Sequence, residues 1–184
     1  MRSDAQGDIL AVLLLSPERE FSLSELSRLT GALGATVHRE VGRLVDFGLL
    51  VDRRVGRTRV VRANTSNRIY GPMSEIVIDT YGPRPVLQDV LADIKGVESA
   101  YIYGSWAARR SGIPGPPPHD IDVLVLGSPT RTDLAHASAE ASRRLGREVN
   151  IHRSTRTDWD NGDGPFERTV KNQPIVELTL QDTA

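Results

Sequence analysis

The most informative residues of this chain are Tyr101-Ile102-Tyr103-Gly104-Ser105-Trp106 and, beyond a Pro- and Gly-rich gap, Asp120-Ile121-Asp122-Val123-Leu124-Val125-Leu126. Successive side chains of a strand alternate between its two faces, so Asp120 and Asp122 are expected to share one face while Ile121 points into a core, as do Val123 and Val125. Two neighbouring carboxylates repel each other unless a positive charge lies between them. Mg²⁺ takes oxygen ligands from one or two carboxylates together with substrate phosphates. The pattern therefore predicts a phosphate-binding turn beside a metal site.

This arrangement resembles the signature of the polymerase β-type nucleotidyltransferase superfamily, and especially its minimal nucleotidyltransferase branch. The resemblance covers roughly the C-terminal half of the chain. It implies that the turn at Gly104 and Ser105 holds a nucleoside triphosphate and that Asp120 and Asp122 bind Mg²⁺ or Mn²⁺. It also implies that a third carboxylate, on a later strand, completes the site.

The residues that follow the turn extend the expected nucleotide site. Gly104 lets the backbone approach a phosphate closely, and Ser105 adds a hydroxyl and a main-chain N–H at the start of a helix. Arg109 and Arg110 could neutralise the β- and γ-phosphates, although an arginine pair on an exposed helix is usually only solvated. The next segment, 112–118, must be extended because its prolines exclude helix. It is a lid, a docking segment or an inert insertion.

Asn150 occupies the position where the resemblance implies the third carboxylate, in the strand Arg147-Glu148-Val149-Asn150-Ile151-His152. An amide can coordinate a metal through its oxygen, but it cannot take a proton from an attacking hydroxyl. Glu148 and His152 are expected on the same strand face as Asn150. Glu148 is a poor direct replacement, because two residues of strand place it about 7 Å away. Whether the chain catalyses a transfer therefore stays open.

The first 63 residues give a different pattern. Apolar spacing predicts a helix over 4–15, a short helix over 23–30 that Ser22 and Glu25 begin as a capping box, and a helix over 35–47. Two short strands, 49–51 and 58–62, are expected to form a hairpin around Gly56. This order is that of a winged helix-turn-helix and resembles ArsR- and MarR-like bacterial regulators. Leu33 stands where such a helix usually has a Ser or Asp cap.

The winged helix-turn-helix implies contacts to double-stranded DNA. The face of the 35–47 helix that is expected to enter the major groove carries Thr36, Arg39, Glu40 and Arg43, flanked by His38. Arginines of the hairpin would hold phosphates or reach a minor groove. They are Arg53, Arg54, Arg57, Arg59 and Arg62, with no acid between them. Residues 1–70 hold 11 basic against 8 acidic side chains, whereas the remainder holds 12 against 16. A solvated hairpin or a protein-binding winged helix are the alternatives.

The remaining segments complete the expected architecture, an α/β (α+β) chain with a winged helix-turn-helix over 1–63 and a nucleotidyltransferase-fold mixed sheet with flanking helices over 85–184. Residues 64–84 form a junction with an apolar helix, interrupted at Gly71-Pro72, which either pairs two chains in a homodimer or packs on its own domain. The second domain is expected to contain helices over 85–95 and 132–145 and near Thr157 and Phe166. Its strands are expected over 100–103, 121–126 and 148–152.

Composition limits the possible classes of function. The 184 residues include no Cys, which excludes disulfides and thiolate metal sites, and no apolar run reaches the ~20 residues that cross a bilayer. A cytoplasmic location is expected. Three functions fit these features: a transcriptional regulator whose second domain binds Mg-nucleotide, an active transferase of NMP from NTP to a protein or small-molecule hydroxyl, and a toxin-antitoxin component that acts through a protein partner.

Overall fold

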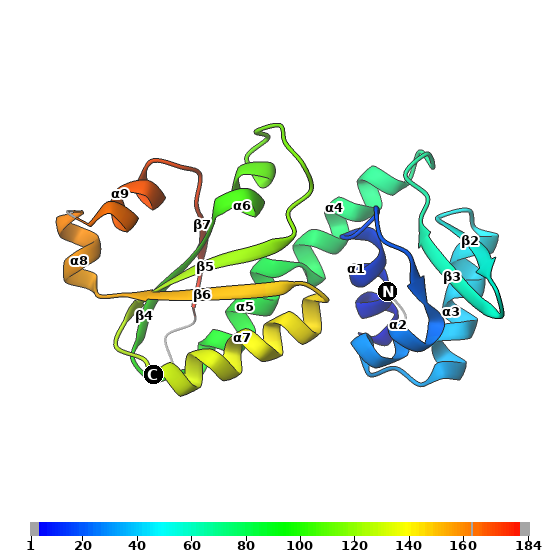
Figure 1. Ribbon diagram of the computed structural model, residues 1–184, viewed down its shortest axis with the longest axis horizontal. Coiled ribbons are helices and arrows are strands. Elements are labelled where there is room, and N and C mark those ends of the chain that lie inside the picture. Colours follow the sequence, from blue (N-terminus) through cyan, green and yellow to red (C-terminus); the bar gives the residue numbers. More distant parts are fainter. Residues whose placement is uncertain (1–3, 163, 181–184) are drawn as a thin grey trace. The chain divides into compact units, whose positions relative to one another are not determined.

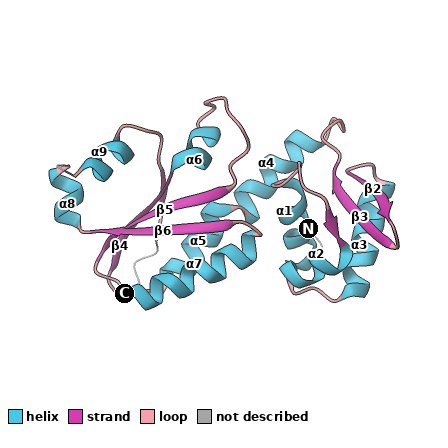
Figure 2. Ribbon diagram, in the orientation of Figure 1, coloured by secondary structure: helices cyan, strands magenta, loops and turns pink. Residues whose placement is uncertain are grey.

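The computed structural model describes residues 4–162 and 164–180. The chain divides into two compact units, Met1–Gly82 and Pro83–Ala184, each with its own sheet and core. Both units combine helices with strands (Figures 1 and 2), which confirms the predicted mixed α/β class. Among the described residues, no helix combines the length and the apolar character that a membrane crossing requires.

The first unit contains the predicted helices and hairpin, with small changes at their ends. The hairpin strands and a short strand between the first two helices form an antiparallel sheet in the order β1-β3-β2. The elements are α1 (Asp4–Leu14), β1 (Phe21–Ser22), α2 (Leu23–Thr30), α3 (Gly34–Asp46), β2 (Leu50–Val55), β3 (Thr58–Ala63) and α4 (Tyr70–Tyr81).

Local sequence signals place the helices of this unit. The Ser22 hydroxyl accepts a hydrogen bond from the Glu25 N–H at 3.1 Å, so the predicted cap is present, and α2 ends at Gly31 with φ +68°. Leu33 precedes α3 without a side-chain cap, as expected. One apolar cluster then joins the three helices to the sheet. Its fully buried members include Ile9, Leu13, Phe21, Leu26, Val37 and Val41.

Two predictions about this unit were wrong in detail. The hairpin strands are longer than expected, so Arg53 and Arg54 lie within β2 and the turn is confined to Gly56 and its neighbours. The junction helix α4 starts at Tyr70, which places Pro72 in its first turn, where proline is tolerated, instead of at an interruption. Helix α4 lies inside the first unit and packs on α1.

The apolar face of α4 is used within its own unit. Val77 is fully buried, and the Tyr70 hydroxyl donates a hydrogen bond to the Leu14 carbonyl at 3.1 Å. Tyr81 lies so close to Gly7 that a Cβ there would overlap its ring. These contacts correspond to the alternative in which the junction packs on its own domain, and they remove the reason for expecting this face to pair two chains.

The second unit is built on a four-stranded sheet in the order β6-β5-β4-β7. Strand β5 runs antiparallel to β4 and parallel to β6, and β7 adds antiparallel to β4. The sequence did not reveal β7, which has only three residues. The elements are α5 (Pro83–Ala92), β4 (Val97–Tyr103), α6 (Gly104–Arg110), β5 (Asp120–Gly127), α7 (Arg131–Leu145), β6 (Glu148–Ser154), α8 (Arg156–Asn161), α9 (Pro165–Lys171) and β7 (Val176–Leu178).

Helices cover both faces of this sheet. Figure 1 shows α5 and α7 on one side of the sheet, with α6, α8 and α9 on the other. Ile121, Val123 and Val125 are completely buried against α5 and α7, which confirms the predicted alternation along β5. The opposite face is apolar only toward the end of the strand, where Leu124 packs with Val170 of α9. The start of that face carries Asp120 and Asp122.

Candidate functional site

The predicted phosphate turn and the predicted carboxylates meet at one end of the sheet. Strand β4 ends at Tyr103, which pairs with Asp122 across the antiparallel ladder, and α6 begins at Gly104. Gly104 has φ +72°, a conformation that favours glycine. A Cβ at this position would also lie 2.5 Å from Asp122 Oδ2. Glycine is therefore required at position 104 for two reasons: the backbone has a positive φ, and a side chain would prevent Asp122 from approaching the first turn of α6.

Strand β6 brings the amide of Asn150 into the same place. The parallel register sets Asn150 beside Asp122 and Glu148 beside Asp120. The Asn150 Nδ2 group donates a hydrogen bond to Asp120 Oδ2 at 3.2 Å. Asn150 thus contacts Asp120 directly and lies beside Asp122 in the strand register.

The electrostatics of this cluster favour a proton or a cation. Burial raises the pKa of Asp122, and the charge of Asp120 raises it further, while the Asn150 hydrogen bond and His152 act in the opposite direction. Tyr103 is 7% exposed, and its burial beside Asp122 and Asp120 raises the pKa of its phenol to about 12. Negative charge is therefore under-compensated around Asp122.

The donor atoms suit a hard divalent cation. Carboxylate oxygens of Asp120 and Asp122 are the ligands that Mg²⁺ prefers, and rotation of the Asn150 amide would add a third oxygen. Glu148 is exposed at the start of β6 and does not join them. Within the part of the chain that the structure describes, no three Asp, Glu or His side chains form a metal-binding group.

Arg109 packs against the segment that follows α6, and its predicted phosphate contact stays a prediction. Its Nε atom is buried without a hydrogen-bond partner among the described residues, and its guanidinium lies against Gly115, where a Cβ would overlap Nη1. The side chain therefore packs under the Pro- and Gly-rich segment after α6. Arg110 is exposed at the end of α6. Ser105 directly follows Gly104 in the first turn of this helix.

Aromatic rings lie beside the carboxylate cluster, and sequence reasoning did not predict them. The ring centroid of Phe166, from α9, lies 5.8 Å from that of Tyr103 and 5.4 Å from that of His152. His152 is the exposed member and follows Asn150 by two residues on the same strand face. Tertiary packing alone brings Phe166 to this place, because more than 60 residues separate it from Tyr103.

The second candidate surface is the exposed face of α3, and one expectation about it was wrong. Glu40 was placed on the DNA-facing side, but its side chain is 6% exposed and accepts hydrogen bonds from three neighbours. Their donor atoms are Arg39 Nε at 3.2 Å, Arg43 Nη1 at 3.1 Å and Gln6 Nε2 at 3.3 Å. Arg39 and Arg43 themselves are more than half exposed. His38 is also exposed, while Thr36 is only partly so.

The hairpin arginines fall into two groups. Arg53 forms a two-pronged ion pair with Glu20, whose pKa is lowered by that hydrogen bond, and Arg59 Nε donates to Asp52 at 2.7 Å. The acids come from outside the arginine run, which is why the sequence pattern missed them. Arg54, Arg57 and Arg62 are exposed, and within the described residues none of them has an ion-pair partner. These three arginines of the hairpin remain candidates for the predicted phosphate contacts.

In comparisons with known proteins, no protein-family model matches the chain, and no curated protein matches it either. The interpretation of both surfaces therefore rests on their own geometry.

Proposed function

We propose that this chain is a cytoplasmic DNA-binding transcriptional regulator whose second unit binds a nucleotide together with Mg²⁺. One observation carries the nucleotide part: Asp120, Asp122 and Asn150 converge beside a glycine that admits Asp122 to the first turn of α6. The DNA part is supported by the helix order of the first unit and by the exposed arginines of α3 and the hairpin.

Each residue of the second unit has a role in this proposal. The carboxylates of Asp120 and Asp122 and the Asn150 amide oxygen would hold Mg²⁺, which neutralises phosphate charge when bound. Gly104 lets Asp122 approach the first turn of α6, and the Ser105 hydroxyl and N–H would donate to phosphate oxygens.

Binding is favoured over transfer by the identity of residue 150. Asn150 holds Asp120 through its amide and has no group that accepts a proton. Glu148 is exposed beside Asp120 and does not supply the missing carboxylate at that position. The second unit would then act as a sensor, in which the nucleotide alters DNA binding by the first unit.

Calorimetric titration of the full chain with ATP, GTP, CTP and UTP, each with and without Mg²⁺, tests the nucleotide part. We expect binding of at least one nucleotide that requires Mg²⁺ and that weakens at least tenfold in Asp122→Asn. Asp160→Asn is the matched control, because Asp160 is exposed on α8. Absence of heat with all four nucleotides, or equal binding by Asp122→Asn, would refute this part.

Selection of DNA from a random duplex library tests the other part. We expect an enriched sequence whose affinity for the protein changes when the identified Mg-nucleotide is added. Light scattering of the free and DNA-bound chain measures whether a homodimer forms. If the nucleotide binds but leaves DNA affinity unchanged, the sensor function is refuted while the nucleotide site stands.

Nucleotide transfer is the second candidate function, and His152 is the observation that favours it. Its imidazole follows Asn150 by two residues on the same face of β6. An imidazole can accept the proton that an amide cannot. Label transfer from α-labelled nucleotides would be lost in His152→Ala but kept in His136→Ala, which changes an exposed histidine of α7. The absence of any transfer from all four nucleotides would refute this candidate.

A further inference from the structure

The outer edge of β6 is only partly covered. β6 ends the sheet order, so it has a strand on one side only. At Val149 the free side is closed by α7, since the Val149 N–H donates to Ser142 Oγ at 2.9 Å and its carbonyl accepts from Ser138 Oγ at 2.6 Å. Such side-chain cover is one way in which proteins protect an edge strand. These bonds also show that the main-chain groups of Val149 point away from β5.

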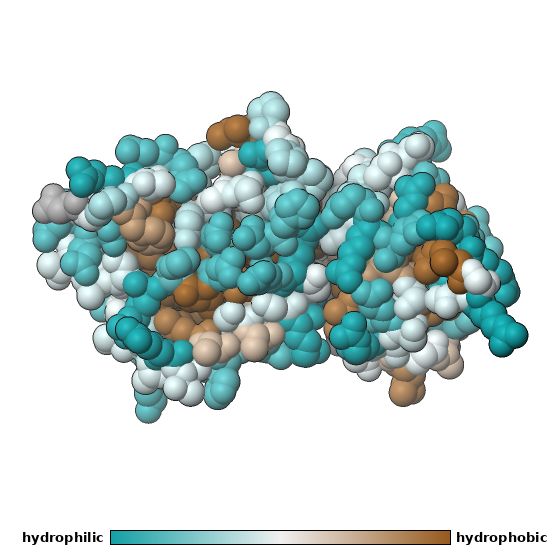
Figure 3. Space-filling view, viewed as in Figure 1, coloured by the Kyte–Doolittle hydropathy of each residue, from teal (hydrophilic) through white to brown (hydrophobic). Residues whose placement is uncertain are grey.

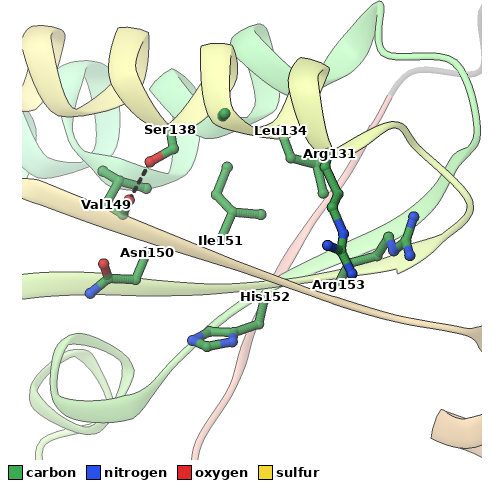
Figure 4. Close-up of a pocket in the computed structure, with 9 residues that line it drawn as sticks. Arg131, Leu134, Ser138, Val149, Asn150, Ile151, His152 and Arg153 are labelled. Carbon is green, nitrogen blue, oxygen red and sulfur yellow. Dashed lines mark hydrogen bonds between the residues drawn. The ribbon is translucent and has the colours of Figure 1, made fainter.

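The cover ends two residues further along the strand. Main-chain direction repeats every second residue, so the N–H and C=O of Ile151 face outward as those of Val149 do. No hydrogen bond joins these two groups to another residue in the described ranges. A cavity of about 560 Å³ lies here between β6 and α7 (Figure 4), within the usual size range of ligand pockets.

The lining of this cavity is basic at one end and apolar along its wall. Arg131 and Arg153 lie at the same end (Figure 4), and Arg153 is fixed by a hydrogen bond from Nη1 to the Pro129 carbonyl at 2.9 Å. No acidic side chain is among its lining residues. The wall contains Leu134 and Ile151, and Figure 3 shows an apolar strip between β6 and α7 that hydrophilic surface borders.

We propose that this edge of β6 binds an extended, acidic peptide segment of a partner protein by strand addition. The main chain of the peptide would pair with the free groups of Ile151, and alternate side chains would contact the Leu134 wall. An acidic side chain of the peptide would reach Arg131 and Arg153. A small anion would use the guanidinium groups but neither the strand edge nor the apolar wall, which is why a peptide fits the cavity better. This binding site uses neither Asp120 nor Asp122 and does not depend on the proposed function.

A displayed library of random 12-residue peptides, selected on the full chain, tests the proposal. We expect enrichment of peptides that combine Asp or Glu with β-branched residues. A synthetic peptide of the enriched sequence should lose at least tenfold in affinity with Arg131→Glu. Arg143→Glu makes the same charge change on α7 outside the cavity and should leave the affinity unchanged. Hydrogen exchange of the Ile151 amide should slow when the peptide binds, because strand addition protects that N–H.

A second variant tests the edge directly. Ile151→Pro removes an N–H that points away from β5, a place where proline is tolerated in edge strands, and it should weaken the peptide at least tenfold. If this variant does not fold, Arg131→Glu and the exchange of the Ile151 amide still decide the matter. Enriched peptides without acidic residues, peptides that bind Arg131→Glu as tightly as the original chain, or no enrichment at all would overturn the proposal. Binding of inorganic phosphate through Arg131, in the absence of binding by any peptide, would also overturn the proposal.

Discussion

Replacement of Glu40 by alanine should destabilise the first unit and release its two exposed arginines. The Glu40 carboxylate is 6% exposed and accepts hydrogen bonds from Arg39, Arg43 and Gln6 at 3.1 to 3.3 Å. Hydrogen bonds to a charged group contribute about 1.5–3 kcal/mol each to stability. The arginines are more than half exposed and regain water, so most of the cost comes from the packing and the Gln6 contact.

From these contacts we expect a loss of about 2 kcal/mol in the free energy of unfolding of the first unit. For a unit of 82 residues this corresponds to a fall in Tm of roughly 10 °C. Glu40→Gln keeps the side-chain size and one acceptor oxygen, so it should cost about half as much. Asp46→Ala, at the exposed end of the same helix, is the control and should change stability by less than about 0.5 kcal/mol.

Urea unfolding separates this effect from changes elsewhere, because Trp106 and Trp159 both belong to the second unit. Circular dichroism should show that the first unit of Glu40→Ala unfolds at a lower urea concentration. The transition seen by tryptophan fluorescence, which follows the second unit, should stay unchanged. In DNA binding, the same variant should lose sequence discrimination more than total affinity, since Arg39 and Arg43 would no longer be held in place. An unfolding free energy within 0.5 kcal/mol of the Asp46→Ala control would refute the structural role of Glu40.

Three further predictions concern the two surfaces. Asp122→Asn should stabilise the second unit at pH 7 by less than about 1 kcal/mol, because solvent screens the half-exposed charges. The pKa of Asp122 is raised in the folded state, so ionisation of this carboxyl group lowers the stability of the original chain as the pH rises. The urea unfolding curves of the original chain and of Asp122→Asn, followed by tryptophan fluorescence, should therefore converge below the ordinary pKa of an aspartate. In the same assay, Gly104→Ala should lower the free energy of unfolding by about 1–2 kcal/mol more than Gly112→Ala. Both glycines have positive φ, but only at Gly104 would the added Cβ meet another atom, Asp122 Oδ2. The logarithm of DNA affinity should fall with the logarithm of salt concentration with a slope of about −3 per chain, and a slope near −6 would contradict the pairing of the other arginines. The arginines counted in this slope are Arg54, Arg57 and Arg62.

The sequence predicted the local features of the fold because their causes are local. The cap of α2 depends on Ser22 and Glu25, three residues apart, and the buried face of β5 depends on alternation within eight residues. The turn at Gly104 was also correctly placed, although its second cause, the approach of Asp122, is visible only in the structure. Strand β7 escaped prediction because three residues carry too little periodicity to distinguish a strand from a loop.

Contacts between distant residues could not be predicted in the same way. Glu40 lies on a polar stretch of α3, and its burial and its hydrogen bond from Gln6, 34 residues earlier, are visible only in the structure. Glu20 reaches Arg53 across 33 residues because β1 adds to the hairpin sheet. Arg53 therefore gains its acid through tertiary packing, whereas the acid that holds Arg39 and Arg43 lies on their own helix.

The paired and the unpaired arginines would have different roles in the proposed DNA contact. A guanidinium that a buried carboxylate already holds loses little side-chain freedom on binding, so it is suited to read a base edge in a fixed geometry. Its charge is already balanced, so it contributes little to the attraction of phosphates. Arg54, Arg57 and Arg62 have the opposite properties, with exposed side chains and with charge that is unpaired among the described residues. The first unit therefore combines two arginines that Glu40 holds on α3 with these three unpaired arginines on the hairpin. Under the proposed function, the unpaired arginines would attract DNA by charge, and the held pair would choose a site by hydrogen bonding.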